Sequence, residues 1–348
     1  ASQIHDHGET VEHKGDIEYL QSSLSDGTAP ELRCLAVLQL ARKALKPAFR
    51  QFLRSSNSYP IIFRRLEAQL DASPALPLPT ALLVYLLSRA RQGIPPDEAT
   101  LRLTLALAKS SAPPPGTSAD YDKTKAKVWD TLDKWSSAQT ATAAGGSFSF
   151  EVTSENLSAS FLAVESLVYI SARASDPKLK EALLNHGILQ FSAASLGDIS
   201  ESLQPLPDPD STHSPESLDQ LRLAERHLRI LEHCTLMAKG NQTFLVSFKS
   251  SVVLTAVGRL MGFFVAELEA VMVRRGEVRA SVLLGNLIAG KTKGIQSMSS
   301  LKPIKVMFQL GIENSVDFSL SDLFVSLLTT AYHLMSRHFT ADPSMIIS

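Results

Sequence analysis

The fold is decided by a stretch that reads Leu35-Ala-Val-Leu-Gln-Leu-Ala41, then Lys46-Pro-Ala-Phe-Arg-Gln-Phe-Leu53, then Pro60-Ile-Ile-Phe-Arg-Arg-Leu66. Apolar residues recur within each part at the spacing of one helix face, and prolines or polar residues separate the parts. Because proline disfavours a helical conformation in the residue before it, Lys46-Pro47 interrupts the first helix. The stretch therefore predicts a long apolar helix, a short helix and a third helix, joined by two turns.

The same three-part unit recurs twice further along the chain. The second copy reads Leu162-Ala-Val-Glu-Ser-Leu-Val168, Asp176-Pro-Lys-Leu-Lys-Glu-Ala-Leu183 and Gly187-Ile-Leu-Gln-Phe191, and the third reads Leu228-Arg-Ile-Leu231, Gly240-Asn-Gln-Thr-Phe-Leu-Val-Ser-Phe248 and Val252-Val-Leu-Thr-Ala-Val257. Such units are typical of HEAT and armadillo repeats, so we expect an all-α, HEAT/armadillo-like helical-repeat solenoid. The matching is loose, and a chance alignment of helical segments is the alternative. A stack of repeats exposes a large surface, which favours the binding of other proteins.

Prolines, glycines and low-complexity segments divide the chain into five parts. We expect a flexible lead-in at residues 1–15, N-terminal helical repeats at 16–109, a low-complexity insertion or linker at 110–148, central helical repeats at 149–295, and divergent or truncated C-terminal helices at 296–348. Within the insertion, Val128, Leu132 and Trp135 are spaced for one short amphipathic helix. The last part is expected to contain a helix at about 319–338.

Two helix starts are marked by the residues around them. Thr28-Ala-Pro-Glu31 has the spacing of a capping box, in which the threonine oxygen accepts an amide of the first turn. Ser214 is the expected N-cap of a helix that starts at Pro215. In that helix Glu225 is placed for an i,i+4 pair with Arg229, on a different face from the expected buried stripe of Leu221, Ala224, Leu228, Leu231 and Thr235.

The composition is that of a globular protein with little overall charge. Of the 348 residues, 44% are hydrophobic and 20% charged, and the formal net charge of −1 gives no long-range attraction to DNA or an anionic membrane. No uninterrupted apolar run reaches the roughly 18 residues of a membrane span, and the first residues do not resemble a signal peptide. Cys34 and Cys234 lie in helical patterns, so we expect buried free thiols in a reduced, intracellular compartment.

One segment, Gly285-Asn-Leu-Ile-Ala-Gly290-Lys291-Thr292, satisfies the pattern of a phosphate-binding P-loop. A P-loop follows a strand, whereas the residues before this segment favour helix, and no apolar strand ending in aspartate offers a magnesium ligand. We therefore interpret the segment as a helix end followed by a basic turn. A nucleotide hydrolase that uses Lys291 and Thr292 is the enzymatic alternative.

Other catalytic and metal-binding patterns are weak. His5, His7 and His13 could bind a metal, but their polar setting favours an incidental grouping. The chain has no Gly-x-Ser-x-Gly motif of the kind that exposes a nucleophilic serine. We therefore expect no catalytic, cofactor-binding or metal site.

The runs Arg33-Cys-Leu-Ala36, Pro47-Ala-Phe-Arg50, Ala224-Glu-Arg-His-Leu-Arg-Ile-Leu-Glu232 and Asn241-Gln-Thr-Phe-Leu245 are more specific than generic helix sequence. On these runs the chain resembles the C-terminal domain of the Wapl (wings apart-like) family of cohesin-release factors. The resemblance extends over about residues 9 to 290, weakens at 110–148 and does not continue beyond about 295. The phenylalanine–glycine–phenylalanine motifs of the family are absent from this chain.

This resemblance implies a non-enzymatic, HEAT-like protein that is nuclear and chromatin-associated. It implies release of cohesin from chromatin by opening of the junction between an SMC subunit and the kleisin. The implied partners are the cohesin core, formed by the SMC and kleisin subunits, and the HEAT-repeat accessory subunits of cohesin. ATP hydrolysis belongs to cohesin, so the resemblance implies no cofactor. An armadillo-type adaptor for an unrelated partner is the alternative.

Polar residues in or beside the matched runs are the candidates for contact with a partner. They are Asp16 and Glu18 near the start, Arg33 and Arg50 in the first copy of the unit, and Asn241 and Lys249 in the third. Arginine and asparagine at repeat turns often cap helices instead, and this is the alternative role for these residues.

Overall fold

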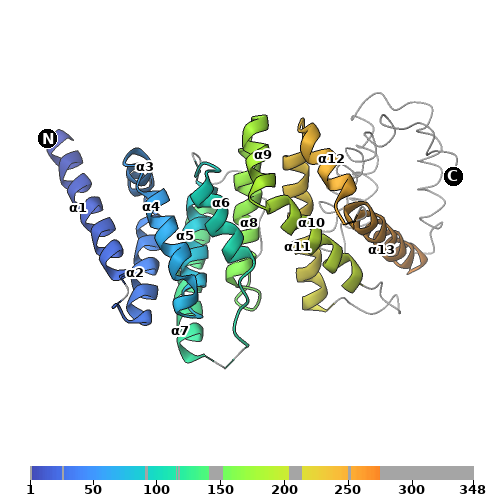
Figure 1. Ribbon diagram of the computed structural model, residues 1–348. Coiled ribbons are helices and arrows are strands. Elements are labelled where there is room, and N and C mark those ends of the chain that lie inside the picture. Colours follow the sequence, from blue (N-terminus) through green and yellow to red (C-terminus); the bar gives the residue numbers. More distant parts are fainter. Residues whose placement is uncertain are drawn as a thin grey trace. The chain divides into compact units, whose positions relative to one another are not determined.

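The computed structural model describes residues 2–25, 27–90, 93–114, 116, 118–140, 152–203, 214–249 and 252–274. Over these residues the chain forms α-helices, a short 3₁₀ helix and loops, and no strand (Figure 1). The predicted all-α class is therefore confirmed, whereas membership of the HEAT or armadillo class stays a prediction. The chain divides into two compact units, Ala1–Ile188 and Leu189–Ser348.

The recurring unit of the sequence is present as three helices in each copy. The copies comprise α2 (Pro30–Lys43), α3 (Pro47–Ser55) and α4 (Tyr59–Gln69); α8 (Ala159–Ala172), α9 (Pro177–Asn185) and α10 (Ile188–Ser202); and α11 (Pro215–Thr235), α12 (Lys239–Ser247) and α13 (Val252–Arg274). The middle helix has nine residues each time. Pro47 and Pro177 occupy the first turn of α3 and α9, where the missing amide of proline has no cost. The predicted order of a long helix, a short helix and a third helix is confirmed.

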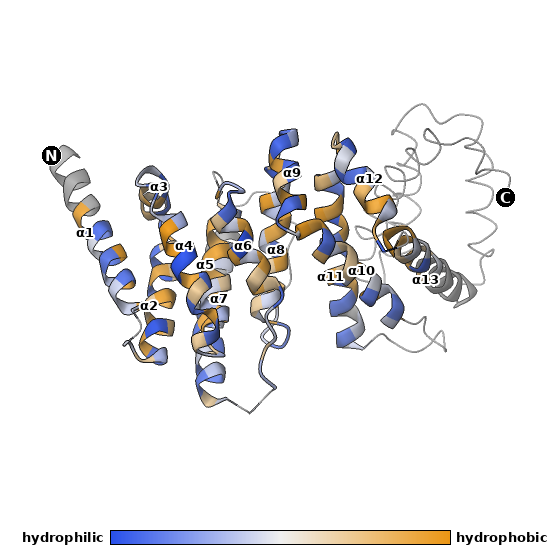
Figure 2. Ribbon diagram, in the orientation of Figure 1, coloured by the Kyte–Doolittle hydropathy of each residue, from blue (hydrophilic) through white to orange (hydrophobic). Residues whose placement is uncertain are grey.

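The interior of the first unit lies around α5 (Pro77–Arg89) and α8. α5 contacts α2, α6 (Glu98–Ala108), α7 (Ala119–Thr140) and α8, and every residue from Leu78 to Ser88 is buried. A helix that is apolar all around is stable in water only when other helices cover it. α8 is coloured mostly toward the apolar end of the scale in Figure 2, and nearly all of its residues are buried.

A half-buried arginine borders this interior at the end of α5. Arg89, in the last turn of α5, donates a hydrogen bond to the Tyr85 hydroxyl at 2.6 Å. Its Cζ lies 4.8 Å from the centre of the Trp135 ring on α7 and 5.9 Å from that of Tyr169 on α8. Burial alone would lower the pKa of Arg89, but Tyr85, Tyr169 and, to the smallest extent, the buried Glu165 together raise it. Arg89 therefore joins three helices through one guanidinium group.

The segment expected to be a flexible lead-in is helical, and the short helix predicted within the low-complexity segment is present and has 22 residues. α1 (Ser2–Ser23) replaces the flexible lead-in expected at 1–15, because Ile17, Leu20 and the following Leu24 bury their side chains and hold the helix on α2 and α3. α7 occupies much of the low-complexity segment at 110–148, and Val128 and Leu132 are buried as their spacing predicted. Residues 141–148 lie outside the described part. In both helices the burial of a few apolar residues at helical spacing stabilises the helix, although most of its residues are polar.

Of the two predicted helix starts, one is wrong and the other is confirmed. The capping box at Thr28 is wrong, because α2 begins at Pro30 with Ala29 as N-cap, and the Thr28 hydroxyl lies 3.0 Å from that of Ser25. The start at Ser214 is confirmed, since its hydroxyl accepts the Ser217 amide at 3.2 Å. The apolar stripe predicted for α11 is buried at all five positions, namely Leu221, Ala224, Leu228, Leu231 and Thr235.

Helix α11 also holds buried ionisable groups of the second unit. The carboxylate of Glu225 accepts hydrogen bonds from Arg226 and Arg229, so the predicted Glu225–Arg229 pair is confirmed. His227 is 3% exposed, and its ring packs edge-on to that of Phe191, with 5.5 Å between the ring centres. Burial lowers the pKa of His227 to about 4, so the imidazole is neutral at pH 7.

Both cysteines are in the state that the sequence predicts. Cys34 and Cys234 are free and buried, as predicted, and burial raises the pKa of the Cys34 thiol to about 11. Among the described residues no single helix is long and apolar enough to cross a membrane, and only the bent pair Lys239–Ser247 and Val252–Phe263 passes by length and composition. The helix expected at 319–338 lies outside the described residues.

Candidate protein-binding surface

The two acidic candidates on α1 have different surroundings. The carboxylate of Asp16 lies 3.0 Å from the ammonium of Lys43 on α2, which also lies 2.8 Å from Glu12. Lys43 lowers the pKa of Glu12, and the two carboxylates raise the pKa of Lys43. Glu18 is exposed and lies 3.9 Å from Lys14, a pairing that contributes little in water. Asp16 therefore helps to hold α1 on α2, whereas Glu18 is accessible to a partner.

Arg33 and Asn241 are buried, and both bond to the backbone of their own chain. Arg33, 6% exposed, donates to the Gln69 side chain and, through Nη2, to the Ser25 carbonyl at 3.1 Å. Asn241, 3% exposed, donates through Nδ2 to the Cys234 carbonyl at 2.9 Å near the end of α11. Side chains that satisfy buried carbonyls stabilise the fold and leave little surface for a partner. Partner contact by these two residues stays a prediction that their burial disfavours.

Lys249 lies on the turn that follows α12 and is exposed. Its φ of 43° is in the left-handed region, which non-glycine residues adopt uncommonly. The ammonium lies 5.6 Å from the centre of the Phe248 ring, so the charge stays at the surface beside an aromatic face. The turn therefore presents a cation to solvent in the second unit.

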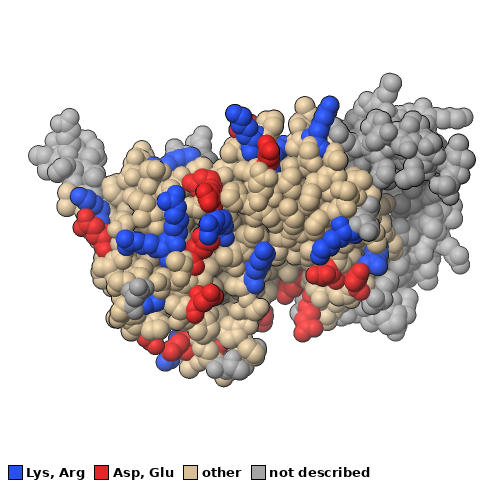
Figure 3. All heavy atoms as spheres, viewed as in Figure 1, with Lys and Arg blue, Asp and Glu red and all other residues tan. Residues whose placement is uncertain are grey.

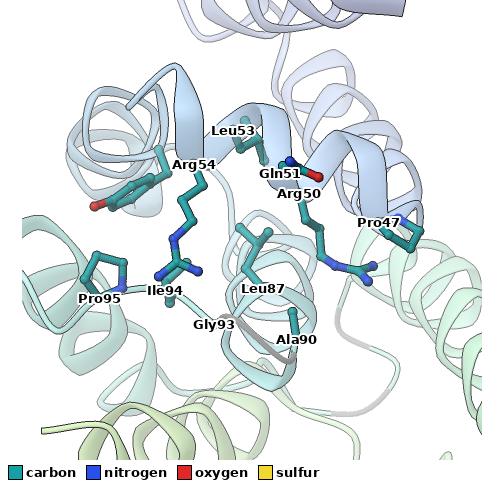
Figure 4. Close-up of a pocket in the computed structure, with 11 residues that line it drawn as sticks. Pro47, Arg50, Gln51, Leu53, Arg54, Leu87, Ala90, Gly93, Ile94 and Pro95 are labelled. Atoms are coloured by element: carbon teal, nitrogen blue, oxygen red, sulfur yellow. The ribbon is translucent and has the colours of Figure 1, made fainter. Parts of the chain in front are cut away.

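Arg50 lies beside a pocket of about 200 Å³ in the first unit, formed between α3 and the segment from the end of α5 to Pro95. Figure 4 shows Arg50 and Arg54 extending from α3 toward this segment, with Leu87 between them. The two arginines are four residues apart, so α3 places them on one face. Leu53, Leu87, Ile94 and Pro95 make the lining largely apolar.

The chain's own backbone holds the shape of this pocket. Arg50 donates through Nη1 to the carbonyls of Ala44 and Leu45, at 2.7 and 2.8 Å, where α2 ends. On the other side Arg173 donates to the carbonyls of Ser88 and Ala90, at the end of α5. Gly93 has a φ of +55°, and any Cβ there would collide with the Arg173 guanidinium. Arg173 therefore binds the backbone at the end of α5 and lies directly against Gly93.

The charge around the pocket is positive. Burial and then the charge of Arg54 lower the pKa of Arg173, so these two guanidinium groups lie near enough to repel each other. The nearby carboxylate of Asp97 accepts a hydrogen bond from the Thr100 amide at 2.9 Å. Burial, and to a lesser extent the charge of Asp97, raises the pKa of Tyr59 to about 12. Asp97 is thus already engaged as the N-cap of α6.

The sequence contains a signal for this positive region that the predictions overlooked. Between Leu32 and Leu66 there is no acidic residue, while the basic residues are Arg33, Arg42, Lys43, Lys46, Arg50, Arg54, Arg64 and Arg65. Some of them are engaged, since Lys43 pairs with α1 and Arg65 donates to the Gln21 carbonyl at 3.1 Å. On the face shown in Figure 3, basic side chains gather over α4. A net charge near zero for the whole chain conceals this local excess.

The family profile described as "Wings apart-like protein regulation of heterochromatin" matches residues 1–337. The chain belongs to this family. The wings apart-like protein homolog 1 of Caenorhabditis elegans is 33% identical to this Wapl-family chain over 268 residues, which cover 75% of the chain and 34% of that protein. The resemblance inferred from the sequence is therefore confirmed, but its predicted end at about residue 295 is wrong, since the family profile continues to residue 337.

Two further relatives of this Wapl-family chain carry the same kind of name. The protein wings apart-like of Drosophila melanogaster is 28% identical over 254 residues, covering 71% of the chain and 14% of that protein. The wings apart-like protein homolog of Homo sapiens is 28% identical over 258 residues, covering 73% and 20%. The chain thus matches about a third or less of the length of each of these relatives.

The sequence also suggested a phosphate-binding segment and a metal site. The P-loop-like segment Gly285–Thr292 lies outside the described residues. Within the described part of the chain no group of three or more His, Cys, Asp or Glu residues is placed to hold a metal ion. His13 is buried, with its ring 5.0 Å from that of Phe49 and 5.4 Å from that of Phe52. His13 therefore packs α1 onto α3.

Proposed function

We propose that this chain is a non-enzymatic, nuclear binding module that engages cohesin and promotes its release from chromatin. The observation that carries the proposal is membership of the wings apart-like family over nearly the whole chain. In this proposal the partners are the SMC and kleisin subunits of the cohesin core and its HEAT-repeat accessory subunits, and release proceeds by opening the SMC–kleisin junction.

The helical architecture supports a binding role. Stacked helical units offer extended surfaces on a rigid interior, and the described helices carry exposed charged residues over a well-packed core. Of the six predicted contact residues, Glu18 and Lys249 are the most accessible, and Arg50 lies at a pocket. We therefore place Glu18 and Lys249 first among the contacts to be tested, ahead of Asp16, which is paired with Lys43.

The test is capture of purified cohesin by the purified chain. A Glu18→Lys variant should lower the cohesin recovered, because it reverses a charge that is accessible and weakly paired. Glu31→Lys, which makes the same charge change at another exposed position, is the matched control. Recovery that is equal for wild type, Glu18→Lys and Glu31→Lys would remove Glu18 from the contact surface.

The release activity needs a separate measurement. Addition of the chain to isolated chromatin should raise the amount of cohesin in the supernatant, without any nucleotide hydrolysis by the chain alone. Crosslinking mass spectrometry in nuclear extract distinguishes this function from an armadillo-type adaptor, since the proposal requires cohesin subunits among the main crosslinked partners. Mg-ATP binding that is lost in Lys291→Ala would instead support the hydrolase alternative.

A further inference from the structure

The turn between α11 and α12, in the second unit, exposes two large apolar side chains. Leu236 is 46% exposed and Met237 is 85% exposed. Met237 also has a φ of 59°, in the left-handed region that non-glycine residues adopt uncommonly. In the second copy of the three-helix unit the equivalent turn reads Arg173-Ala-Ser-Asp176 and contains no large apolar residue. The repeating unit therefore does not require an apolar turn at this place, and the third copy has one exposed to solvent.

The helix that follows this turn, α12, has one side open to solvent. Its exposed residues recur at the spacing of one helix face and are Lys239, Gly240, Thr243 and Ser247. A Cβ on Gly240 would meet no atom within 4 Å. The half-buried Phe244 borders this face, and its ring packs on that of the half-buried Phe248, with 5.1 Å between the ring centres. The open face extends along the whole helix, which is about 13 Å long at 1.5 Å per residue.

The charges along α12 are positive. Lys239 at the start of the helix and Lys249 after its end are both exposed, and no carboxylate of the described residues forms an ion pair with either ammonium. The ammonium of Lys249 lies 5.6 Å from the centre of the Phe248 ring, which places the charge beside the aromatic pair. The sequence from His233 to Ala266 contains no acidic residue. Cations next to exposed apolar side chains are complementary to a segment that carries both carboxylates and apolar side chains.

We propose that the α12 surface docks an acidic amphipathic helix of a protein partner, where the α12 surface comprises Met237, Lys239, Phe244, Phe248 and Lys249. The partner helix lies along α12, and its carboxylates pair with Lys239 and Lys249. Its apolar side chains cover Met237 and the exposed part of the aromatic pair. The inference rests on the proposed binding role of the chain and adds the chemistry of the partner segment.

Two other ligands fit the α12 surface less well. A helix that lies in an anionic membrane surface presents a broad apolar face, whereas the solvent-facing side of α12 carries lysine, glycine, threonine and serine. A nucleic acid strand needs exposed aromatic rings on which its bases stack, whereas Phe244 and Phe248 are half-buried and pack on each other. Both ligands are included in the test because each would overturn the assignment.

The test measures fluorescence anisotropy of a fluorescein-labelled helical peptide. The peptide carries leucine, glutamate, leucine and glutamate in this order on one face, each about one helical turn after the last. The full chain should bind it, and Lys239→Glu should weaken binding about tenfold because one ion pair becomes a repulsion. Lys178→Glu is the matched control, since Lys178 is exposed in the first turn of α9, the equivalent nine-residue helix of the second copy. It should alter the dissociation constant less than about twofold. An acidic residue is favoured in the first turn of a helix, so both variants should fold.

A second variant tests the apolar part of the α12 surface without changing charge. Met237→Gly removes the exposed side chain, and glycine adopts the left-handed backbone at no steric cost, so the thermal melt should not fall. Binding of the peptide should weaken about tenfold.

Several results would overturn the proposal: no binding of the peptide by wild type, unchanged binding by Met237→Gly, or equal weakening by Lys239→Glu and Lys178→Glu. Tighter Lys239-dependent binding of phosphatidylserine vesicles or of labelled single-stranded DNA would also overturn it. The assay contains no cohesin, so its failure overturns the α12 surface alone, whereas failure of the wild-type chain to capture cohesin overturns the proposed function.

Discussion

In the first unit, Arg89 and the Arg50–Arg54 pair both lie beside apolar side chains, but they differ in what covers them. Trp135 of α7 and Tyr169 of α8 lie over the Arg89 guanidinium, and Tyr85 accepts its hydrogen bond. The arginines of α3 instead border a pocket that opens to solvent. A covered arginine joins helices of its own chain, whereas an arginine at the edge of a pocket keeps part of its side chain in contact with solvent.

The largest effect should come from removing the covered arginine. Arg89→Ala removes the hydrogen bond to the Tyr85 hydroxyl and the contact of the guanidinium with the Trp135 ring. We expect the free energy of unfolding to fall by about 2–3 kcal/mol, from the loss of a hydrogen bond made by a charged group and of a cation–π contact. Urea unfolding followed by tryptophan fluorescence measures this. Arg64→Ala is the matched surface control, and an equal loss in both variants would show that Arg89 is not covered.

The second unit contains a buried histidine, His227, whose pKa is lowered by burial. Burial lowers the pKa of His227 from 6.5 to about 4, so between these values the unfolded chain binds a proton that the folded chain does not. The free energy of unfolding should therefore decrease as the pH falls from about 6.5 toward 4, by about 2–3 kcal/mol from this group. Unfolding of wild type and His227→Leu, measured across this pH range, isolates the effect. Parallel pH profiles for the two proteins would contradict it.

The smallest stability effect should come from an arginine at the pocket. Arg50→Ala removes two hydrogen bonds to the carbonyls that end α2, but water reaches this site and replaces them in part. We expect a loss of about 1 kcal/mol. Comparison with Arg89→Ala in the same urea experiment sharpens the contrast between covered and uncovered arginines. A loss as large as that of Arg89→Ala would place Arg50 among the structural arginines.

The sequence predicted most of the described fold for identifiable reasons. Helical spacing of leucine and other apolar residues, interrupted at Lys46-Pro47 and Asp176-Pro177, gave the order of helices in each copy of the unit. Ser214 predicted the start of α11, because a serine hydroxyl just before a first-turn proline can accept a hydrogen bond from a free backbone amide of that turn. These features depend on neighbours within a few residues, which the sequence displays directly.

The candidate site was predicted less well, because its members come from distant parts of the chain. Arg33 and Arg50 look alike in the sequence, yet the first is buried against Gln69 and Ser25 while the second borders a pocket. Asn241 is a candidate contact, and its side chain donates to the Cys234 carbonyl near the end of α11, which the sequence did not indicate. Likewise, α1 is helical although its sequence is polar, because α2 and α3 cover its few apolar residues.

The sequence by itself determined the helical class, the recurrence of the three-helix unit, the buried thiols of Cys34 and Cys234 and the family of the chain. Each of these follows from local periodicity or from runs of residues that can be read in order. Tertiary structure alone decided that Arg89 is covered by aromatic rings while Arg54 faces a pocket. The physical reason is that the role of a charged side chain depends on the helices packed beside it, and such helices are far away in sequence.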